Sequence, residues 1–155
     1  MRRTIMKKSI VLSTLLILLL TACISQDPKE VHLHTDECVY CKMVVSDMQF
    51  ASQMVSDKGK SYTFDSIECM AAYHYQNPDH AGKSKMYVSD YTRQKQWILI
   101  DNANIYHAET IQSPMGLSLF AMPGHVPLPS DIGDAELMNW NVTVNYVVDK
   151  WDLQR

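Results

Sequence analysis

The sequence predicts an α+β fold in which two small, related ββαβ units pack together, with the second unit trimmed. Three observations support this. The 155 residues are 46% hydrophobic and 20% charged, as in one ordinary globular domain. Short segments with the alternation of half-buried strands outnumber segments of helical periodicity. Finally, Tyr87-Val88-Ser89-Asp90 resembles Tyr146-Val147-Val148-Asp149, which indicates a duplicated unit. Two such units are too small to stand alone and would share one core.

The chain begins with the parts of a lipoprotein signal peptide. Four basic residues stand before an apolar run at 9–20, and Leu20-Thr21-Ala22-Cys23 closes it. The run is too short to span a bilayer as a helix and has the flanks of a secretory signal. We therefore expect removal of residues 1–22, a lipid on Cys23, and a lipidated tether over residues 23–35.

Processing would change the charge of the chain. It removes four of the 14 basic residues and none of the 17 acidic ones, so ten basic residues remain and the net charge falls from −3 to −7. Such an acidic chain lacks the basic surface of a nucleic-acid-binding protein, and its acyl chains must provide the attachment to the membrane. Ile24, in place of the aspartate that retains lipoproteins at the inner membrane, favours the outer membrane, with the domain facing the periplasm.

Residues 36–95 form the first predicted unit. Strands are expected at 43–45, 51–55 and 61–64, with a turn at 57–60 between the last two. Asp65-Ser66 offers a helix N-cap, and apolar residues then recur every three or four positions up to Gln76, where Asn77-Pro78 ends the helix. A strand at 86–89 completes the unit.

Residues 96–155 form the second predicted unit. A strand at 96–100 and a hairpin partner at 103–108 flank the turn Asp101-Asn102. The segment Ser113-Pro114-Met115-Gly116 follows, and a Pro-rich loop comes after residue 121. A short helix is expected at 131–138. A strand at 141–148 closes the chain.

The motif best suited to bind a metal ion is Cys38-Val39-Tyr40-Cys41-Lys42-Met43. Two thiolates three residues apart can bind one metal ion from a single loop, and the Met43 thioether can complete a site of low coordination number. Thiolates and thioethers together favour Cu(I) over harder ions. Met115 lies at a loop-to-strand junction and is a second candidate thioether ligand. Cys69 is the remaining thiol, and its place in a helix favours a buried, inert residue.

Two alternatives remain open for the same pair of cysteines. A zinc site would need further ligands, for which Cys69 and His74, or His32 and His34, are available. A thioredoxin-type pair has the same spacing but begins a helix after a strand, whereas here a polar, His-containing stretch precedes the motif and a Val-Val strand follows. His107 is a further candidate imidazole ligand for copper.

Residues 36–47, Asp-Glu-Cys-Val-Tyr-Cys-Lys-Met-Val-Val-Ser-Asp, resemble the signature of the NosL family, copper-binding lipoproteins of denitrifying bacteria. The segments Tyr62–Ile67 with Met70, Met86–Tyr91 and Ser113–Gly116 are similar to further parts of that family. The resemblance covers residues 37–121. It implies two related ββαβ units and ligation of copper by Cys41, Met43 and Met115, with Cys38 close behind.

The resemblance also implies a function. A member of this family would be a metallochaperone and not an enzyme, delivering Cu(I) to apo nitrous oxide reductase or another cuproenzyme. It would work beside a membrane ABC-type maturation complex. The Pro-rich segment after residue 121 departs from the family pattern, because a long second helix is expected there.

Overall fold

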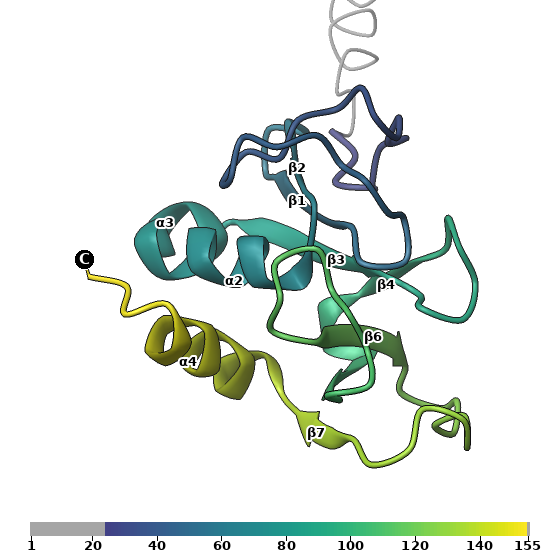
Figure 1. The fold of residues 1–155 in the computed structure, drawn as a ribbon. Helices are drawn as coiled ribbons and strands as arrows, with labels where there is room; N and C mark the ends of the chain where they lie inside the picture. The colour runs from purple at the N-terminus through teal and green to yellow at the C-terminus, as the bar shows by residue number, and fades with distance from the viewer. Residues whose placement is uncertain (1–23, 155) are drawn as a thin grey trace, which may run out of the picture.

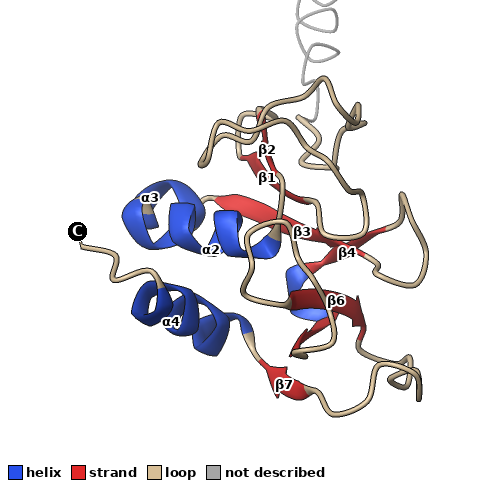
Figure 2. Ribbon diagram, in the orientation of Figure 1, coloured by secondary structure: helices blue, strands red, loops and turns tan. Residues whose placement is uncertain are grey.

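The computed structural model describes residues 24–154, so the expected signal peptide and Cys23 lie outside the described residues. Two small antiparallel sheets and their helices make up this part of the chain, as Figures 1 and 2 show, and the predicted α+β class is confirmed. Within residues 24–154, no helix has the length and apolar character that crossing a membrane requires.

The first sheet contains four antiparallel strands in the order β2-β1-β3-β4. They are β1 (Ser52–Ser56), β2 (Ser61–Phe64), β3 (Ser84–Ser89) and β4 (Trp97–Leu99). The predicted turn after β1 is confirmed: Gly59 has φ +72, and its N–H donates to the carbonyl of Ser56 at 2.8 Å. The predicted strand at 43–45 is reduced to one bridge between Glu37 and Val44.

The predicted helix of the first unit is α2 (Ile67–Gln76). Ser66 is its N-cap, and the Ser66 side chain accepts a hydrogen bond from the N–H of Cys69. Pro78 begins a separate short helix, α3 (Pro78–Ala81), where the sequence predicts the end of α2. The buried face of α2 packs with Met54 and Val88 of the sheet in the main core, and each such fully buried apolar side chain contributes about 1.5–3 kcal/mol.

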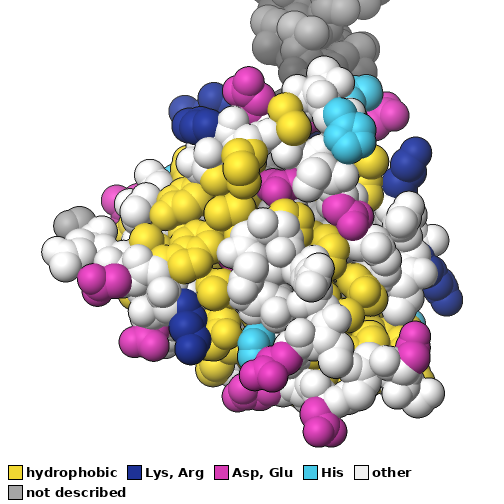
Figure 3. All heavy atoms as spheres, viewed as in Figure 1, with side chains coloured by type: hydrophobic (Ala, Val, Ile, Leu, Met, Phe, Trp, Pro, Cys, Tyr) yellow, Lys and Arg dark blue, Asp and Glu magenta, His cyan; other side chains and the backbone are white. Residues whose placement is uncertain are grey.

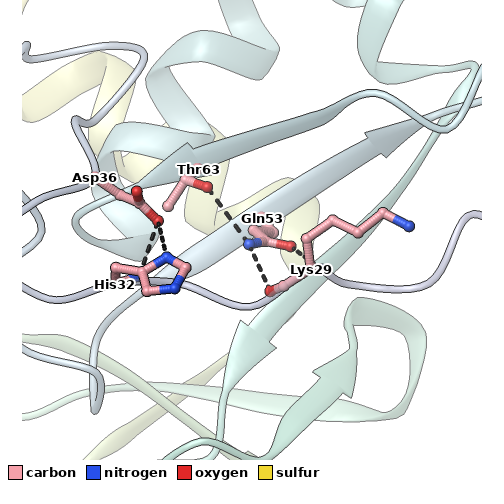
Figure 4. Close-up of polar contacts among 5 residues, drawn as sticks. All are labelled: Lys29, His32, Asp36, Gln53 and Thr63. Atoms are coloured by element: carbon pink, nitrogen blue, oxygen red, sulfur yellow. Dashed lines mark hydrogen bonds and ion pairs between the residues drawn. The ribbon is translucent and has the colours of Figure 1, made fainter.

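The opposite face of this sheet is covered by residues 24–30, which we call the N-terminal strap. Gln53 and Val55 of β1 are both 0% exposed. The Gln53 side chain accepts a hydrogen bond from the N–H of Lys29 at 2.8 Å and donates one to the Lys29 carbonyl at 3.0 Å, as Figure 4 shows. Gln26 Nε2 donates to the Val55 carbonyl at 3.2 Å. Residues 24–30 of the expected tether therefore lie against the domain, because their polar groups bond to the sheet.

Removing the strap should destabilise the domain. A chain that begins at Val31 should lose about 2–4 kcal/mol of unfolding free energy relative to one that begins at Ile24, since Val55 and Tyr87 become exposed and the Gln53 amide loses its Lys29 partners. Urea unfolding of the two chains in parallel measures the difference, with Glu30→Gln as an exposed control. Equal transition midpoints would show that the strap contributes nothing.

The second sheet has the order β6-β5-β7. Its strands are β5 (Ala103–His107), β6 (Leu119–Pro123) and β7 (Glu136–Met138). The predicted hairpin between 96–100 and 103–108 is wrong: β4 pairs with β3, and β5 pairs with β6 and β7. A 3-10 turn, η1 (Ile100–Asn102), separates β4 from β5 and leads the chain into the other sheet. The first sheet thus extends past residue 96, where we expected the second unit to begin.

The last two predicted elements are also wrong. Residues 131–135 form a turn and an irregular loop, in which Gly133 has φ +78, and β7 occupies the end of the expected helix. The expected strand at 141–148 is part of helix α4 (Trp140–Lys150), capped by the Asn139 side chain. Alternating valines favour a strand, but Thr143, Val144 and Val147 are the buried residues, and their spacing is helical. The second half therefore ends in a helix.

Helix α4 lies against α2, which joins the two halves of the chain (Figure 1). The main core contains buried residues of both halves, among them Met70 of α2 and Val147 of α4. Trp140 Nε1 donates a hydrogen bond to His74 Nδ1 at 2.9 Å. Burial lowers the pKa of His74, in keeping with a neutral imidazole that accepts this bond. His74 is thus a packing residue between the two helices.

Candidate metal centre

The motif loop of residues 38–43 is closed by its own backbone. The N–H of Cys38 donates to the carbonyl of Met43 at 2.7 Å, and the N–H of Lys42 donates to the carbonyl of Cys38 at 3.0 Å. Lys42 adopts φ 65, which makes the tight return possible. The N–H of Val39 donates to the carbonyl of Thr63 at 2.9 Å. This last bond attaches the loop to β2, directly before the start of α2.

Three thiols meet at this point. The Sγ atoms of Cys38, Cys41 and Cys69 all lie within 4.8 Å of one another, and we call these three residues the thiol cluster. Cys38 and Cys69 are fully buried, whereas Cys41 is half-buried at the edge. Cys69 comes from the first turn of α2. Our expectation that Cys69 is buried is correct, but its position beside the motif makes it a candidate ligand and not an inert residue.

The thiol cluster carries one thiolate. Hydrogen bonds from the Cys69 thiol and from backbone N–H groups lower the pKa of Cys38 from an ordinary value of 9.0 to about 5. The same bond to Cys38, together with burial, raises the pKa of Cys69. Burial also raises the pKa of Cys41. At neutral pH the cluster therefore holds one negative charge and two thiol protons, which a metal ion bound to all three sulfurs would displace.

The two predicted thioether ligands lie on different segments. Met43 is in the motif loop, two residues after Cys41, with 49% of its surface exposed. Met115 lies in the segment Ser113–Ser118 and packs partly buried against the main core, which also contains Cys38 and Cys69. The structure thus brings Cys38 and Cys41 together, while ligation by Met43 and Met115 stays a prediction.

The Met115 segment is fixed to α2 next to Cys69. The Ser113 hydroxyl donates a hydrogen bond to Glu68 Oε1 and accepts one from the N–H of Ser118 at 2.9 Å. Glu68 is 0% exposed, and burial raises the pKa of its carboxyl group. Its second oxygen has no hydrogen-bond partner among the described residues. A buried carboxyl group with raised pKa therefore connects the turn that bears Met115 to the turn that bears Cys69.

An aromatic pair covers the motif loop. Tyr40 stacks on Trp151, which follows α4, with ring centroids 6.0 Å apart and an interplanar angle of 13°. Hydrophobic side chains gather on this face near α2 and α4, as Figure 3 shows. The thiols thus have an apolar surround on the side of Trp151, while Met43 and Val44, 49% and 44% exposed, lie open to solvent.

Comparison with known proteins identifies a family and a solved structure that this chain resembles. The NosL family model matches residues 30–122, which is more than half of the chain. This chain belongs to the NosL family. The crystal structure of the copper chaperone NosL from Shewanella denitrificans resembles the fold with a TM-score of 0.60 and 14% sequence identity, over 76% of this chain and 95% of that chain. The comparison with curated proteins gives no match.

The NosL match includes Cys38, Cys41, Cys69, Met43 and Met115. It ends before β7 and α4, so Trp151 and the aromatic cover lie beyond the matched region. The solved relative is a copper chaperone, and a chaperone of this kind is not an enzyme. The chain is thus a NosL family member with a three-cysteine group that is able to hold a metal ion.

The histidines considered from the sequence lie elsewhere in this NosL family member. The cluster found among residues 24–154 contains cysteines only. His32 is largely exposed and its Nδ1 is 3.6 Å from Asp36 Oδ2. The His107 ring packs 5.3 Å from that of Tyr146. A mixed Cys and His zinc site is therefore not assembled by the described residues, although three thiolates remain acceptable ligands for zinc.

Proposed function

We propose that this chain is a Cu(I) metallochaperone of the cell envelope, anchored through a lipid on Cys23. It would hold Cu(I) with the thiolates of Cys38, Cys41 and Cys69, with Met43 and Met115 as thioether ligands at the edge. It would then deliver the ion to a cuproenzyme, for which apo nitrous oxide reductase is the first candidate, beside a membrane ABC-type maturation complex. The observation that carries the proposal is the thiol cluster.

Donor chemistry supports copper as the cargo. Thiolates and thioethers are soft ligands, which suit Cu(I) better than hard divalent ions. The two fully buried thiols limit the access of solvent to the metal, whereas Cys41 and Met43 stand at the open edge. An incoming soft ligand of the acceptor can approach from that edge and replace the ligands of the chaperone one at a time. This arrangement favours transfer over storage.

The charge and the anchor support delivery in the periplasm. The net charge of −7 expected after processing would steer the protein toward a basic patch on its acceptor. A lipid on Cys23 would confine the search to a membrane surface and so raise the effective concentration of both partners. Since Ile24 follows Cys23, we place the protein at the outer membrane, facing the periplasm.

Competition titration tests the proposal. The soluble chain 24–155 is titrated without oxygen against Cu(I) held by a chromogenic chelator, in parallel with Cys41→Ser and Met43→Leu. We expect about one equivalent of Cu(I) on the unaltered chain and at least about tenfold weaker binding by each variant, since each loses one soft ligand. Met48→Leu, a buried methionine outside the motif, is the matched control and should bind as the unaltered chain does.

Two outcomes would contradict the copper proposal. A chain that takes no Cu(I) but binds Zn(II) would be a zinc-stabilised lipoprotein, the alternative that three thiolates allow. Its unfolding midpoint should then fall on treatment with a zinc chelator. A chain that binds neither ion and turns over with a dithiol substrate would be a thiol-disulfide protein.

A further inference from the structure

The N-terminal strap determines which end of the molecule meets the lipid. Ile24 lies against the β1–β2 turn, where a Cβ added to Gly59 would be 2.9 Å from Ile24 Cγ2 and 3.2 Å from the Ser25 carbonyl oxygen. Consecutive Cα atoms are at most about 3.8 Å apart, the value across a trans peptide bond. Ile24 is bonded directly to Cys23, so a lipid on Cys23 would be attached to the chain next to the β1–β2 turn.

The strap allows little movement between this attachment point and the domain. Gln26 Nε2 donates to the carbonyls of Val55 and Lys83 at 3.2 and 3.4 Å, and the Tyr87 hydroxyl donates to the Gln26 carbonyl at 3.0 Å. The two bonds between Lys29 and the buried Gln53 side chain follow three residues later. A lipid on Cys23 would thus hold one particular face of the domain against the bilayer.

That face differs in charge from the rest of the chain. We call residues 24–30, 57–60 and 79–85 the anchor end. It contains five of the ten basic residues of the mature chain, and four of its 17 acidic residues, so its net charge is +1. The remainder has five basic and 13 acidic residues and a net charge of −8. Acidic side chains gather near β7 in Figure 3, at the end of the molecule opposite the strap, which Figure 1 shows near β1 and β2.

A pocket of about 410 Å³ lies at the anchor end, and Lys58, Lys60 and Lys83 line it. Asp57 and Asp79 also line the pocket, so the lysines exceed the aspartates by one. All three lysines are exposed. Lys60 Nζ is 4.8 Å from the centroid of the Tyr62 ring, which holds this ammonium group at the mouth of the pocket.

We propose that the anchor end docks on anionic phospholipid headgroups, with the ammonium groups of Lys58, Lys60 and Lys83 binding the lipid phosphates. This inference rests on the lipid anchor of the proposed function. The acyl chains supply the attachment, and the lysines determine the orientation, because anionic headgroups attract the anchor end and repel the acidic remainder. The bilayer would then lie against the β1–β2 turn and the start of β3, with the acidic end directed away from it.

Amide hydrogen exchange on vesicles tests this orientation. The full lipidated chain, with its acyl groups verified by mass, is placed in vesicles of phosphatidylglycerol and phosphatidylethanolamine, or of phosphatidylcholine alone. Amides of residues 56–60 and 82–85 should exchange about fivefold more slowly on the anionic vesicles than on the zwitterionic ones. Triple replacement of Lys58, Lys60 and Lys83 by Glu should remove the difference. The matched triple, Arg93→Glu, Lys95→Glu and Lys150→Glu, changes the net charge equally and should retain it.

Three results would overturn the inference. The amides of the anchor end could exchange equally fast on anionic and zwitterionic vesicles, or both triple variants could lose the protection equally. The chain could also prove to carry no acyl groups. None of these results concerns copper. Cu(I) affinity measured on the same three proteins should be equal, since the substituted residues lie outside the thiol cluster. A chain that fails to bind Cu(I) but keeps its protection on anionic vesicles would contradict the chaperone proposal and leave this one standing.

Discussion

Cys69→Ser should weaken Cu(I) binding by about 100-fold or more, because it removes one of three sulfurs that lie within 4.8 Å of one another. Serine retains a hydroxyl group of similar size but is a poor ligand for a soft ion. Cys69→Ala leaves Cys38 without this hydrogen-bond donor, so the pKa of Cys38 should rise in that variant. Anaerobic chelator competition measures the affinity.

The neighbouring residue offers the control. Met70 is fully buried in the same turn of α2, and Met70→Leu nearly conserves its volume. This variant should bind Cu(I) as the unaltered chain does. Cys69→Ala, compared by circular dichroism and urea unfolding, separates loss of a ligand from loss of fold. If Cys69→Ser keeps full affinity while folded, Cys69 only packs the core and the site consists of the motif loop alone.

Cu(I) affinity should also rise steeply with pH, by about 100-fold per pH unit near neutrality. With a pKa of about 5, Cys38 is already ionised at pH 7, whereas the raised pKa values of Cys41 and Cys69 keep their protons in place. Binding to all three sulfurs then releases two protons. Below about pH 5, Cys38 is protonated as well, and the slope of log Cu(I) affinity against pH should increase toward three.

Calorimetry in two buffers of different ionisation enthalpy counts the protons released, and chelator competition between pH 6 and 8 gives the slope independently. A slope near one would indicate that only one of the two protonated thiols binds. A slope near zero would mean that neither Cys41 nor Cys69 binds, so that the Cys38 thiolate and thioethers carry the site. Cys41→Ser should lower the slope by one, because it removes one of the two protons.

Local signals in the sequence were sufficient for the first half of the fold. Helix α2 was predictable because its signals are local: the Ser66 cap, the apolar periodicity up to Gln76 and the Asn77-Pro78 stop. The valines near the C-terminus misled the strand prediction, because packing of Val144 and Val147 in the main core outweighs the preference of β-branched residues. The strands that pair with β4 and with β5 could not be predicted in this way, because hydrophobic periodicity within one segment carries no information about its partner strand.

The candidate site was predictable in part. Spacing alone brings Cys38 and Cys41 together in one loop, and soft-ligand chemistry adds Met43 and Met115 as predictions. Cys69 is separated from the motif in sequence, and tertiary contacts such as the bond between Val39 and Thr63 place the loop at the start of α2. The sequence indicated a tether but not its attachment to the sheet, since nothing local shows that Gln53 binds the backbone of Lys29.

The stack of Tyr40 on Trp151 has a consequence for the order in which the molecule is completed. A chain that is completed from its N-terminus has all three residues of the thiol cluster in place once residue 69 has emerged. The aromatic partner arrives 82 residues after Cys69, with nearly the last part of the chain. The three sulfurs can therefore come together before Trp151 stacks on Tyr40. During that interval the motif loop lacks the ring that packs on it in the finished protein.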